Sequence, residues 1–466
     1  MTPAALADVL ARQRRSFADD PNPPLALRRD RLKRLAAMLR EHAAGIRDAI
    51  SADFGHRAAE ETLLLDQFAS LEGIAHARRQ LAGWMRPEAR PVAWWSLPGR
   101  ARLHRQPLGV IGIIVPWNYP LYLAVSPLTA ALAAGNRAML KLSEHTPRFG
   151  ALFESLVARA FATEEVAVVN GDAAVAKAFA ALPFDHLLFT GSTAVGREVM
   201  KAASAHLTPV TLELGGKSPA IVGGGFEIGE CARRIMFGKL ANAGQTCVAP
   251  DYALVPNALV NRFIEACSAA ARAFYPTLST NPQYTSIASE RHYRRLAACV
   301  DDAIERGASV HRLHPEAADE SRRRFPPVAL TDVTDDMRVM QEEIFGPILP
   351  VVGYEGIGAA IAFVNARPRP LALYYFGADD SDRRAVLART ISGGVTINNV
   401  GMHVLQESLP FGGVGASGMG AYHGRAGFDA FSKVKPVFVD GRLSAAALLQ
   451  PPFGRRFRAL LRLLAR

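Results

Sequence analysis

The chain is poor in cysteine and has no long apolar run. Its four cysteines include no Cys-x-x-Cys pair and no His-x-x-x-His pair accompanies them, so we expect no metal site. Sparse cysteine also fits a reducing compartment with free thiols. No segment reaches the roughly 18 apolar residues that a membrane-spanning helix needs, and residues 1–10 lack the apolar core of a secretory signal. We therefore expect a cytoplasmic protein.

Acidic residues are missing from the end of the chain. The segment from Arg442 to Arg466 holds six arginines and no acid, in a chain whose formal net charge is +11. No nucleic-acid recognition motif accompanies this charge, so we expect no nucleic-acid partner. Apolar side chains recur on this tail at helical spacing, at Phe453, Phe457, Leu460, Leu461 and Leu464.

Two interpretations of this basic amphipathic tail, residues 442–466, remain open. The favoured one is a helix that docks on the body of the protein or on a partner subunit. The other is peripheral contact with an anionic membrane, because the arginines fill the face opposite the apolar side chains. The second interpretation would make the protein membrane-associated as well as cytoplasmic.

Helical and strand-like segments alternate along most of the chain. Residues 27–50 and 63–84 carry the apolar stripe of amphipathic helices, and prolines then break the pattern. Short apolar runs alternate with helical stretches over residues 102–214, and the alternation resumes in the second half. This order predicts an α/β fold with doubly wound parallel sheets.

The candidate chemistry centres on a cysteine, a glutamate and an asparagine. Cys247 follows a predicted helix on an irregular loop, whereas the other three cysteines lie in apolar helical stretches. A thiol attacks only as the thiolate, so it needs a lowered pKa or a base. Glu213 ends a predicted strand 34 residues earlier, and Asn118 carries an amide donor. Together they would serve as nucleophile, general base and oxyanion donor. An inert thiol, a surface glutamate and a turn asparagine are the plain alternatives.

Three loops could hold a nucleotide. Gly191 and Ser192 follow a predicted strand and precede a helix, an arrangement that often binds phosphate. The spacing to Gly196 differs from the usual dinucleotide fingerprint, so a plain tight turn explains it equally well. Lys141 and Glu144 follow another strand and could bind ribose hydroxyls, or could be solvated loop charges. The segment with Glu343 and Phe345 offers a carboxylate and a ring, or a turn with a core phenylalanine.

These motifs occur in a recognisable order. From about Leu103 to Pro436 the chain carries Pro-Trp-Asn-Tyr-Pro, Lys-Leu-Ser-Glu, Phe-Thr-Gly-Ser, Glu-Leu-Gly-Gly-Lys-Ser-Pro, Gly-Gln-Thr-Cys, Glu-Glu-Ile-Phe-Gly-Pro and Phe-Gly-Gly-Val-Gly. In this order they resemble the aldehyde dehydrogenase superfamily. The sequences Gly-Gln-Thr-Cys-Val-Ala-Pro-Asp and Gly-Met-Gly-Ala-Tyr-His-Gly resemble its class 3 branch, which includes bacterial coniferyl aldehyde dehydrogenases. Leu142, where many relatives have proline, departs from the pattern and leaves the neighbouring Lys141 and Glu144 in place.

The resemblance implies two Rossmann-like domains and a small bridging arm that mediates oligomerisation. The NAD(P)-binding domain would comprise residues 1–86 and 107–210, and the catalytic domain residues 211–400. Residues 87–106 and 401–441 would form the arm and the late loops. Class 3 relatives are dimers, so a homodimer is expected.

The resemblance also implies a reaction. Cys247 would attack an aldehyde to form a thiohemiacetal, oxidation would leave a thioester, and Glu213 would activate the water that releases the acid. The aldehyde would be aromatic, of the coniferyl type, or a medium-to-long aliphatic one. Two alternatives share the fold. An acylating or phosphate-reductase relative usually lacks the glutamate, and a non-catalytic protein of this fold tends to lose the cysteine.

The resemblance implies a cofactor set too. Lys141 and Glu144 would bind the adenosine ribose, Gly191 and Ser192 would lie near the pyrophosphate, and Glu343 would hold the nicotinamide ribose. NAD is the expected cofactor, because a carboxylate beside the adenosine ribose repels a 2′-phosphate, with NADP as the alternative. The remaining members of the predicted cofactor site are Trp117, Gly196, Leu214 and Phe345.

Overall fold

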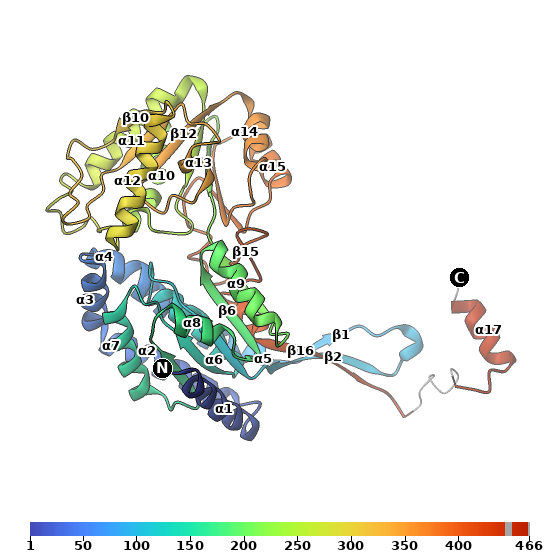
Figure 1. Cartoon of the computed structure of the whole chain (residues 1–466). Coiled ribbons are helices and arrows are strands. Elements are labelled where there is room, and N and C mark those ends of the chain that lie inside the picture. The colour runs from blue at the N-terminus through green and yellow to red at the C-terminus, as the bar shows by residue number, and fades with distance from the viewer. Residues whose placement is uncertain (443–449, 465–466) are drawn as a thin grey trace.

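The computed structural model describes residues 1–442 and 450–464 and has two α/β lobes joined to a long arm (Figure 1). Each lobe is built on one sheet, and the arm is a third, smaller sheet. Across the described residues, no helix combines the length and the apolar character needed to span a membrane.

The first lobe contains a six-stranded sheet in the order β15-β7-β6-β3-β4-β5. Its strands are β3 (Val110–Ile114), β4 (Arg137–Lys141), β5 (Val166–Val169), β6 (His186–Gly191), β7 (Val210–Leu214) and β15 (Gly418–Met419). All neighbours pair in parallel except β15, which runs antiparallel to β7. The carboxyl ends of five strands therefore lie at one edge of the sheet.

Helices cover both faces of this sheet because its strands are apolar on both sides. Alternate residues such as Ile111 and Ile113 pack with α2 (Leu25–Glu41), α3 (Ala43–Phe54), α5 (Ala69–Met85), α6 (Tyr122–Ala134), α7 (Pro147–Ala160) and α16 (Gly424–Ala430). The other alternate set, including Val110, packs with α1 (Pro3–Asp19), α8 (Ala173–Ala180) and α9 (Thr193–Ser204). This confirms the prediction of a doubly wound sheet.

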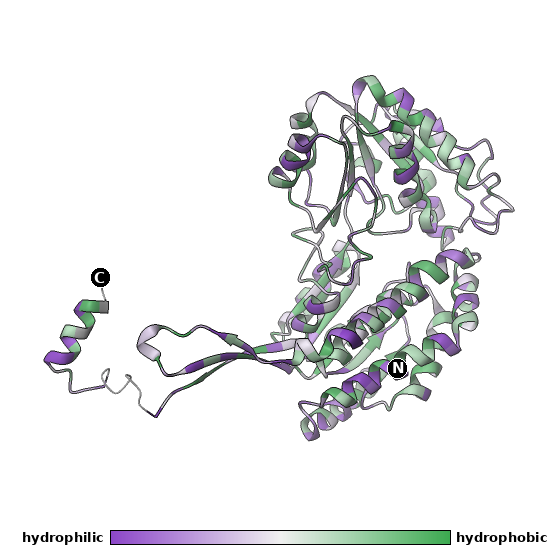
Figure 2. Cartoon of the chain, turned by 180° about the vertical axis from the view of Figure 1, so that it is seen from behind, coloured by the Kyte–Doolittle hydropathy of each residue, from purple (hydrophilic) through white to green (hydrophobic). Residues whose placement is uncertain are grey.

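The second lobe contains a seven-stranded sheet in the order β10-β11-β12-β9-β8-β13-β14. Its strands are β8 (Pro219–Val222), β9 (Tyr252–Pro256), β10 (Ser309–Arg312), β11 (Val328–Thr331), β12 (Ile348–Tyr354), β13 (Ala372–Phe376) and β14 (Gly394–Ile397). Only β10 is antiparallel to its neighbour. The helices of this lobe are α10 (Ile228–Leu240), α11 (Val260–Phe274), α12 (Glu290–Glu305), α13 (Arg338–Gln341), α14 (Gly356–Asn365) and α15 (Asp380–Arg389). Figure 2 shows apolar strands between helices that have one apolar and one polar face.

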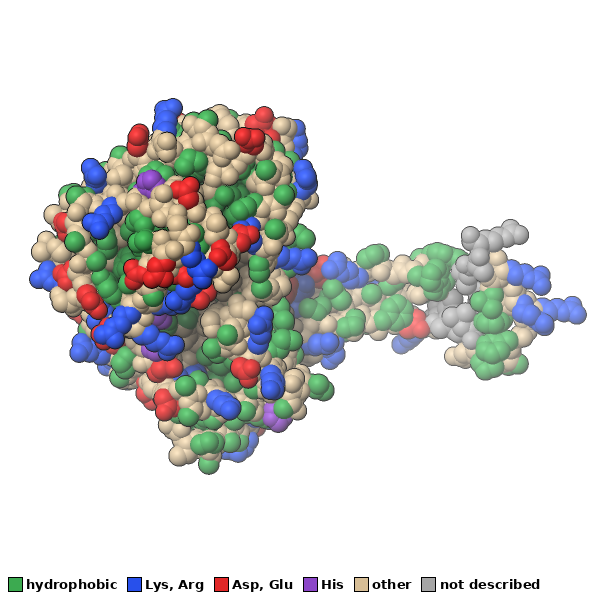
Figure 3. Space-filling model, turned by 45° about the horizontal axis from the view of Figure 1, so that its top comes forward, with side chains coloured by type: hydrophobic (Ala, Val, Ile, Leu, Met, Phe, Trp, Pro, Cys, Tyr) green, Lys and Arg blue, Asp and Glu red, His purple; other side chains and the backbone are tan. Residues whose placement is uncertain are grey.

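The arm consists of β1 (Glu88–Arg90), β2 (Arg100–Pro107) and β16 (Ser432–Val439). β16 pairs antiparallel with all of β2, from Ser432 opposite Pro107 to Val439 opposite Arg100. Apolar side chains are exposed towards its far end (Figure 3), at Trp94, Trp95, Leu97, Phe438 and Val439. The structure therefore joins residues about 330 positions apart in one narrow sheet.

Two predicted helices differ from the observed ones. The helix predicted over residues 27–50 is two helices, because His42 adopts a non-helical conformation between α2 and α3. The helix predicted over residues 63–84 begins as α4 (Ala59–Glu61) and passes through a π-helical turn, Thr62–Phe68, into α5. This wide turn buries Thr62 and Asp66 and exposes Leu63 and Leu64, which reverses the expectation from hydrophobicity alone.

The structure also contains elements that the sequence patterns did not indicate. The strands β8, β10 and β11 and the helix α15 were not predicted. The chain leaves the first sheet after β7, so the boundary predicted at residue 211 falls inside that strand. Part of the basic tail forms α17 (Arg455–Leu464), whereas residues 443–449 and 465–466 of that prediction, and the side chains of Leu460 and Leu464, lie outside the described residues.

Candidate active site

A cavity of about 230 Å³ lies where the ends of β3, β6 and β7 meet the loops of the second lobe. Nine of the twelve predicted site residues line it: Trp117, Asn118, Gly191, Ser192, Glu213, Leu214, Cys247, Glu343 and Phe345. Lys141, Glu144 and Gly196 are not among its lining residues. The structure thus brings the predicted nucleophile, base and amide donor to one cavity.

Cys247 lies on a loop whose backbone is fixed by an unusual turn. A 3₁₀ turn, Ala241–Gly244, follows α10, and its residues Asn242 and Ala243 have φ values of 52° and 51°. Non-glycine residues rarely adopt this left-handed conformation, which concentrates at functional sites. Gly244 also has φ 76°, and a Cβ atom there would lie 2.4 Å from the carbonyl oxygen of Gly346. The turn requires glycine at this point.

The electrostatic environment keeps the Cys247 thiol protonated at neutral pH. Burial, with the nearby carboxyl groups of Glu343 and Glu213, raises the pKa of Cys247 to about 12. The backbone N–H groups of Cys247 and Val248 act in the opposite direction because they point towards the sulfur. The thiol therefore needs a base, and the same amides offer donors beside the sulfur.

The Asn118 side chain is buried beside this loop. It follows β3 and is 4% exposed, and its Nδ2 donates to the backbone oxygen of Gln245 at 3.2 Å. An amide nitrogen carries two hydrogens, so a second donor remains for the cavity. Gln245 is itself held by Asn242 and Ser286, whose carbonyl oxygens accept from its Nε2.

A buried ion pair that the sequence analysis missed holds the Asn118 loop. Arg57 and Asp66 are both fully buried, with 2.9 Å between Nη2 and Oδ2. Arg57 also donates to the Asn118 backbone oxygen at 3.1 Å, and Asp66 accepts from the Tyr122 backbone N–H at 2.9 Å. The pair therefore forms hydrogen bonds with the backbone on both sides of Pro120. No sequence pattern pointed to it, because Arg57 lies between the two predicted helices and Asp66 lies on the second, where charged residues ordinarily face solvent.

Glu213 lies near the end of β7, between two neighbouring strands. It is opposite Thr190 of β6 and Gly418 of β15, and 2% of its surface is exposed. Neither carboxyl oxygen of Glu213 has a hydrogen-bond partner within the described residues. Burial raises its pKa well above the usual value, so its carboxylate form binds a proton more tightly than an exposed glutamate does.

The other end of the cavity fits a dinucleotide. The first turn of α9 follows Gly191, and Ser192 caps it by accepting from the Val195 backbone N–H. Helix N-termini of this kind bind phosphate. A Cβ atom at Gly196 would lie 2.7 Å from Leu214, so α9 packs too closely on β7 for a larger residue.

Glu343, Phe345 and Trp117 form the wall between the lobes. The Glu343 carboxyl accepts from the Gly216 backbone N–H, while its Oε1 is buried with no partner in the described part of the chain. Burial and the neighbouring Asp251 raise the pKa of Glu343 to about 8. The Phe345 ring stands edge-on to Trp117, with 5.4 Å between ring centroids.

Lys141 and Glu144 lie apart from these lining residues, at the end of β4. The Lys141 side chain is buried, and its Nζ is 3.7 Å from the Glu144 carboxylate. The Lys141 carbonyl oxygen accepts a hydrogen bond from the backbone N–H of Val115, the residue before Pro116, which lines the cavity.

Two further lining residues, His292 and Arg295, were not predicted from the sequence. They lie on α12, whose only sequence signal is its apolar stripe. Burial and the nearby Arg295 lower the pKa of His292 to about 4.

A second cavity, of about 130 Å³, meets the first at Cys247 and Leu123. It is mostly apolar, and its aromatic lining residues are Tyr119, Tyr122, Phe237 and Phe411. The aliphatic ones include Leu65, Val400, Val404 and Leu405. The Tyr119 hydroxyl is engaged by Thr246 at 2.6 Å and the Tyr122 hydroxyl by His423 at 2.9 Å. Cys247 thus lines both the cavity that contains Glu213, Glu343 and Arg295 and the apolar cavity.

Comparison with known proteins agrees with this arrangement. Residues 2–437 match the aldehyde dehydrogenase family. This chain is a member of the aldehyde dehydrogenase family. It is 51% identical to a probable coniferyl aldehyde dehydrogenase of Pseudomonas aeruginosa, covering 98% of this chain and 95% of that one. It is 46% identical to the coniferyl aldehyde dehydrogenase of Pseudomonas sp. strain HR199, over 98% and 96% of the two chains. A substrate-bound structure of Staphylococcus aureus AldH superposes with a TM-score of 0.93 at 36% identity, over 98% and 99% of the two chains.

The protein is therefore an NAD(P)-dependent oxidoreductase that acts on aldehydes, as the motifs predicted. The residues of this cavity fit a nicotinamide dinucleotide. Glu343 has a carboxyl oxygen without a partner in the described residues, which could accept from a ribose hydroxyl, and the N-terminus of α9 could bind phosphate. Among the described residues there is no group of three or more histidine, cysteine or acidic side chains arranged for a metal ion.

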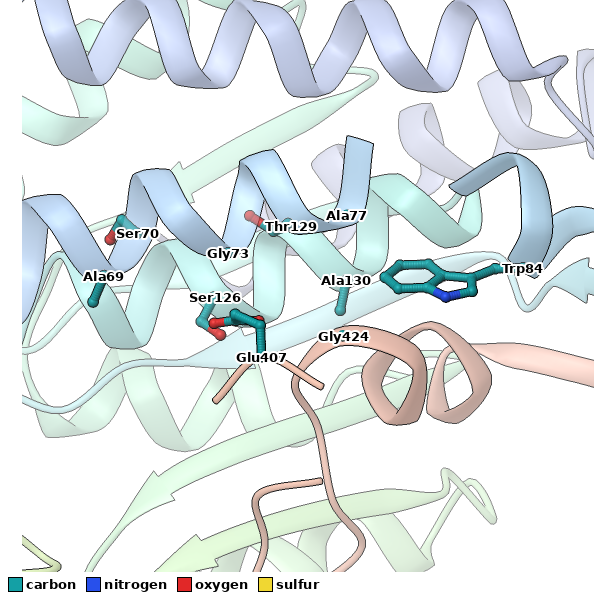
Figure 4. A pocket seen from close by; sticks show the side chains of 10 residues that line it. All are labelled: Ala69, Ser70, Gly73, Ala77, Trp84, Ser126, Thr129, Ala130, Glu407 and Gly424. Atoms are coloured by element: carbon teal, nitrogen blue, oxygen red, sulfur yellow. The ribbon is translucent and has the colours of Figure 1, made fainter. Parts of the chain in front are cut away.

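A small cavity of about 10 Å³ lies beside the apolar one in this aldehyde dehydrogenase (Figure 4). Glu407 and Ser126 both line it and are drawn close together in this view, and Ser70 and Thr129 have hydroxyl oxygens without a partner in the described residues. Burial raises the pKa of Glu407 to about 7. The volume suits a single water molecule rather than a substrate.

Proposed function

We propose that Cys247 is the nucleophile, Glu213 the general base and Asn118 the oxyanion donor of this aldehyde dehydrogenase. One observation carries the proposal: Cys247 lines both cavities, and Glu213 and Asn118 line the first one with it. An aldehyde held in the apolar cavity would present its carbonyl carbon to the sulfur.

The first step forms a bond between sulfur and the carbonyl carbon. The Glu213 carboxylate takes the thiol proton, because burial raises its affinity for a proton and the Cys247 pKa is too high for spontaneous ionisation. The Asn118 amide and the Cys247 backbone N–H stabilise the oxyanion of the thiohemiacetal. The nicotinamide dinucleotide, when bound, supplies the acceptor for the hydride that leaves this carbon.

The second half of the reaction hydrolyses the thioester. Glu213 first passes the thiol proton to solvent, and its carboxylate then removes a proton from a water molecule; the hydroxide attacks the acyl carbon, and the sulfur leaves as thiolate. The carboxylic acid is released, and Cys247 regains its proton. The buried Glu213 carboxyl supports this role and disfavours an acylating activity, which needs no base to activate water.

For the cofactor we propose NAD, with NADP as the weaker alternative. Lys141 and Glu144 would bind the adenosine ribose, and the Glu144 carboxylate would repel a 2′-phosphate. Gly191, Ser192 and the first turn of α9 would bind the pyrophosphate, with Gly196 and Leu214 packed beneath them. Glu343 would hold the nicotinamide ribose, between Trp117 and Phe345. Comparing kcat/KM for NAD and NADP tests the preference: an advantage for NADP would contradict it.

For the substrate we propose an aromatic aldehyde of the phenylpropanoid type. The apolar cavity has four aromatic rings in its wall, and the coniferyl aldehyde dehydrogenases are 46–51% identical over nearly the whole chain. Medium-to-long aliphatic aldehydes are the second candidates, since much of the lining is aliphatic. Reduction of NAD at 340 nm with coniferaldehyde, benzaldehyde and hexanal tests the order. Coniferaldehyde should have the highest kcat/KM, and a preference for hexanal would reverse the assignment.

We propose that the enzyme is a homodimer that uses the arm as its bridging element. The first and second lobes would be the NAD(P)-binding and catalytic domains. Exposed tryptophans on a narrow sheet suit burial against a second copy. The basic tail would dock on the body or on the partner subunit, with an anionic membrane as the alternative. Sedimentation of the full chain and of residues 1–441, with and without anionic vesicles, distinguishes these roles.

A further inference from the structure

A buried ion pair lies just outside the residues that line the active-site cavity. Lys217 follows Glu213 by four residues and Asp251 follows Cys247 by four. The Lys217 Nζ contacts the Asp251 carboxylate, and the two side chains are 11% and 4% exposed. The pair therefore connects the segment of the proposed base to the segment of the proposed nucleophile.

The same two side chains also hold the segment of Glu343. The Lys217 Nζ donates to the carbonyl oxygens of Val339 at 2.5 Å and Glu342 at 3.1 Å. The Asp251 Oδ1 accepts from the Ile344 backbone N–H at 3.0 Å. The residues immediately before and after Glu343 are thus fixed by opposite members of one ion pair.

The position of Glu343 depends on support of its backbone, to which Arg295 also contributes by donating to the backbone oxygens of Glu343 and Ile344, because few contacts restrain the Glu343 side chain itself. Its carboxyl accepts from the Gly216 backbone N–H and lies against Gly215, where a Cβ atom would be 1.9 Å from Oε2. The absence of a side chain at Gly215 leaves space for the Glu343 carboxyl group. The Lys217–Asp251 pair then fixes how far the backbone of Glu343 lies from this turn. A shift of one ångström at such a point can cost about 100-fold in rate.

We propose that Lys217 and Asp251 are positioning residues that hold Glu343 where it binds the nicotinamide ribose. The inference rests on the role proposed above for Glu343. Neither side chain lines the cavity, so the pair acts through the backbone on either side of Glu343. Removing one partner leaves a buried charge unpaired and frees one end of that segment.

Four variants test this on the full chain: Asp251→Ala, Asp251→Asn, Lys217→Met and the double variant Lys217→Met/Asp251→Ala. Titration calorimetry with NAD alone measures the dissociation constant without turnover. We expect it to rise by about 10-fold or more in Asp251→Ala and Lys217→Met. Asp251→Asn keeps the acceptor for Ile344 and should lie between these and the parent. The double variant should be no worse than the poorer single one, because one pair is lost either way.

Hydrolysis of p-nitrophenyl acetate without nucleotide provides the second readout. This ester acylates a cysteine with release of p-nitrophenolate, so it reports on Cys247, Glu213 and Asn118 alone. It should be unchanged in Asp251→Asn and Lys217→Met. A parallel fall in ester hydrolysis would overturn the proposal, since the pair would then support the whole centre rather than Glu343.

Two controls separate the possible failures. Glu165→Gln removes a partly buried partner of Arg31 in the first lobe, with 2.8 Å between their atoms, and should leave NAD affinity unchanged. Glu343→Gln should weaken NAD binding. If Glu343→Gln does not weaken NAD binding, both the proposed role of Glu343 and the inference that rests on it are wrong. If Glu343→Gln weakens binding but Asp251→Asn and Lys217→Met do not, the inference alone is wrong.

Discussion

The side-chain amide of Asn118 donates a hydrogen bond to the backbone oxygen of Gln245, with 3.2 Å between the two atoms. Gln245 lies two residues before Cys247, so the proposed oxyanion donor and the nucleophile loop move together. The donor is set in place before any substrate arrives. Preorganised donors of this kind stabilise developing negative charge without reorganisation during the reaction.

Replacing this amide should slow the reaction with little effect on nucleotide binding. Asn118→Ala should lower kcat by about 10²- to 10³-fold, the usual cost of one oxyanion donor. Asn118→Asp fills the same volume without a donor and should be as slow or slower. Steady-state kinetics with NAD and coniferaldehyde measure both variants. An unchanged kcat in Asn118→Ala would show that the backbone amide suffices.

The two steps assigned to Glu213 can be separated kinetically. Cys247→Ala should abolish aldehyde oxidation, because no thiohemiacetal can form. Glu213→Gln should slow thioester hydrolysis by about 10²-fold or more, given typical contributions of a general base. Stopped-flow at 340 nm should then show a burst of NADH of about one equivalent per active site, followed by a slow steady state. Full steady-state turnover in Glu213→Gln would contradict the role of the base.

Much of the first lobe could be predicted from the sequence, because its strands are apolar runs bounded by clear turns. The apolar run 110–115 corresponds to β3, and a glycine, Gly135, ends α6 in the left-handed conformation that glycine favours. The strands β8 and β11 have only four residues each, too few to show a period. The left-handed Ala243 could not be predicted either, since it is imposed by tertiary contacts.

The candidate site was accessible from the sequence only in part. Cys247, Glu213 and Asn118 stood out because each is a polar or reactive residue at an irregular point of the chain. The Arg57–Asp66 pair did not, because arginine and aspartate side chains are ordinarily expected to face solvent. Only the π-helical turn at Thr62–Phe68 turns Asp66 inward, and no local pattern predicts that turn.

The thiol of Cys247 should react faster as the pH rises. Its pKa is raised to about 12, so the thiolate fraction at neutral pH is small and grows about tenfold per pH unit. The rate constant for iodoacetamide, with inactivation as the readout, should follow this slope up to about pH 9. The folded Cys247→Ala variant should not be alkylated by iodoacetamide, because Cys231, Cys267 and Cys299 are buried. A plateau near neutral pH would show a lower pKa than the site predicts.

The Arg57–Asp66 pair should contribute strongly to stability. Asp66→Asn leaves the buried Arg57 without its partner, which costs about 3–5 kcal/mol in similar pairs. Urea unfolding followed by circular dichroism measures the loss. Glu290→Gln is the matched control, because its pair with Arg294 is exposed and such pairs contribute little. Equal free energies of unfolding for the two variants would show that the Arg57–Asp66 pair does not hold the Asn118 loop in place.

Glu343 should make the stability of the nucleotide-free enzyme fall with rising pH. Its pKa is about 8 in the folded protein and near the ordinary glutamate value of 4.5 in the unfolded chain. Between these values the folded state binds more protons than the unfolded state, so the free energy of unfolding decreases as the pH rises. The contribution is fully present below about pH 4.5 and is lost as the pH passes through about 8. Glu343→Gln removes this pH-dependent contribution. The melting temperature of the variant, relative to that of the parent, should therefore rise from pH 5 to about pH 9. A constant difference across this range would mean that the carboxyl is not perturbed by its burial beside Asp251.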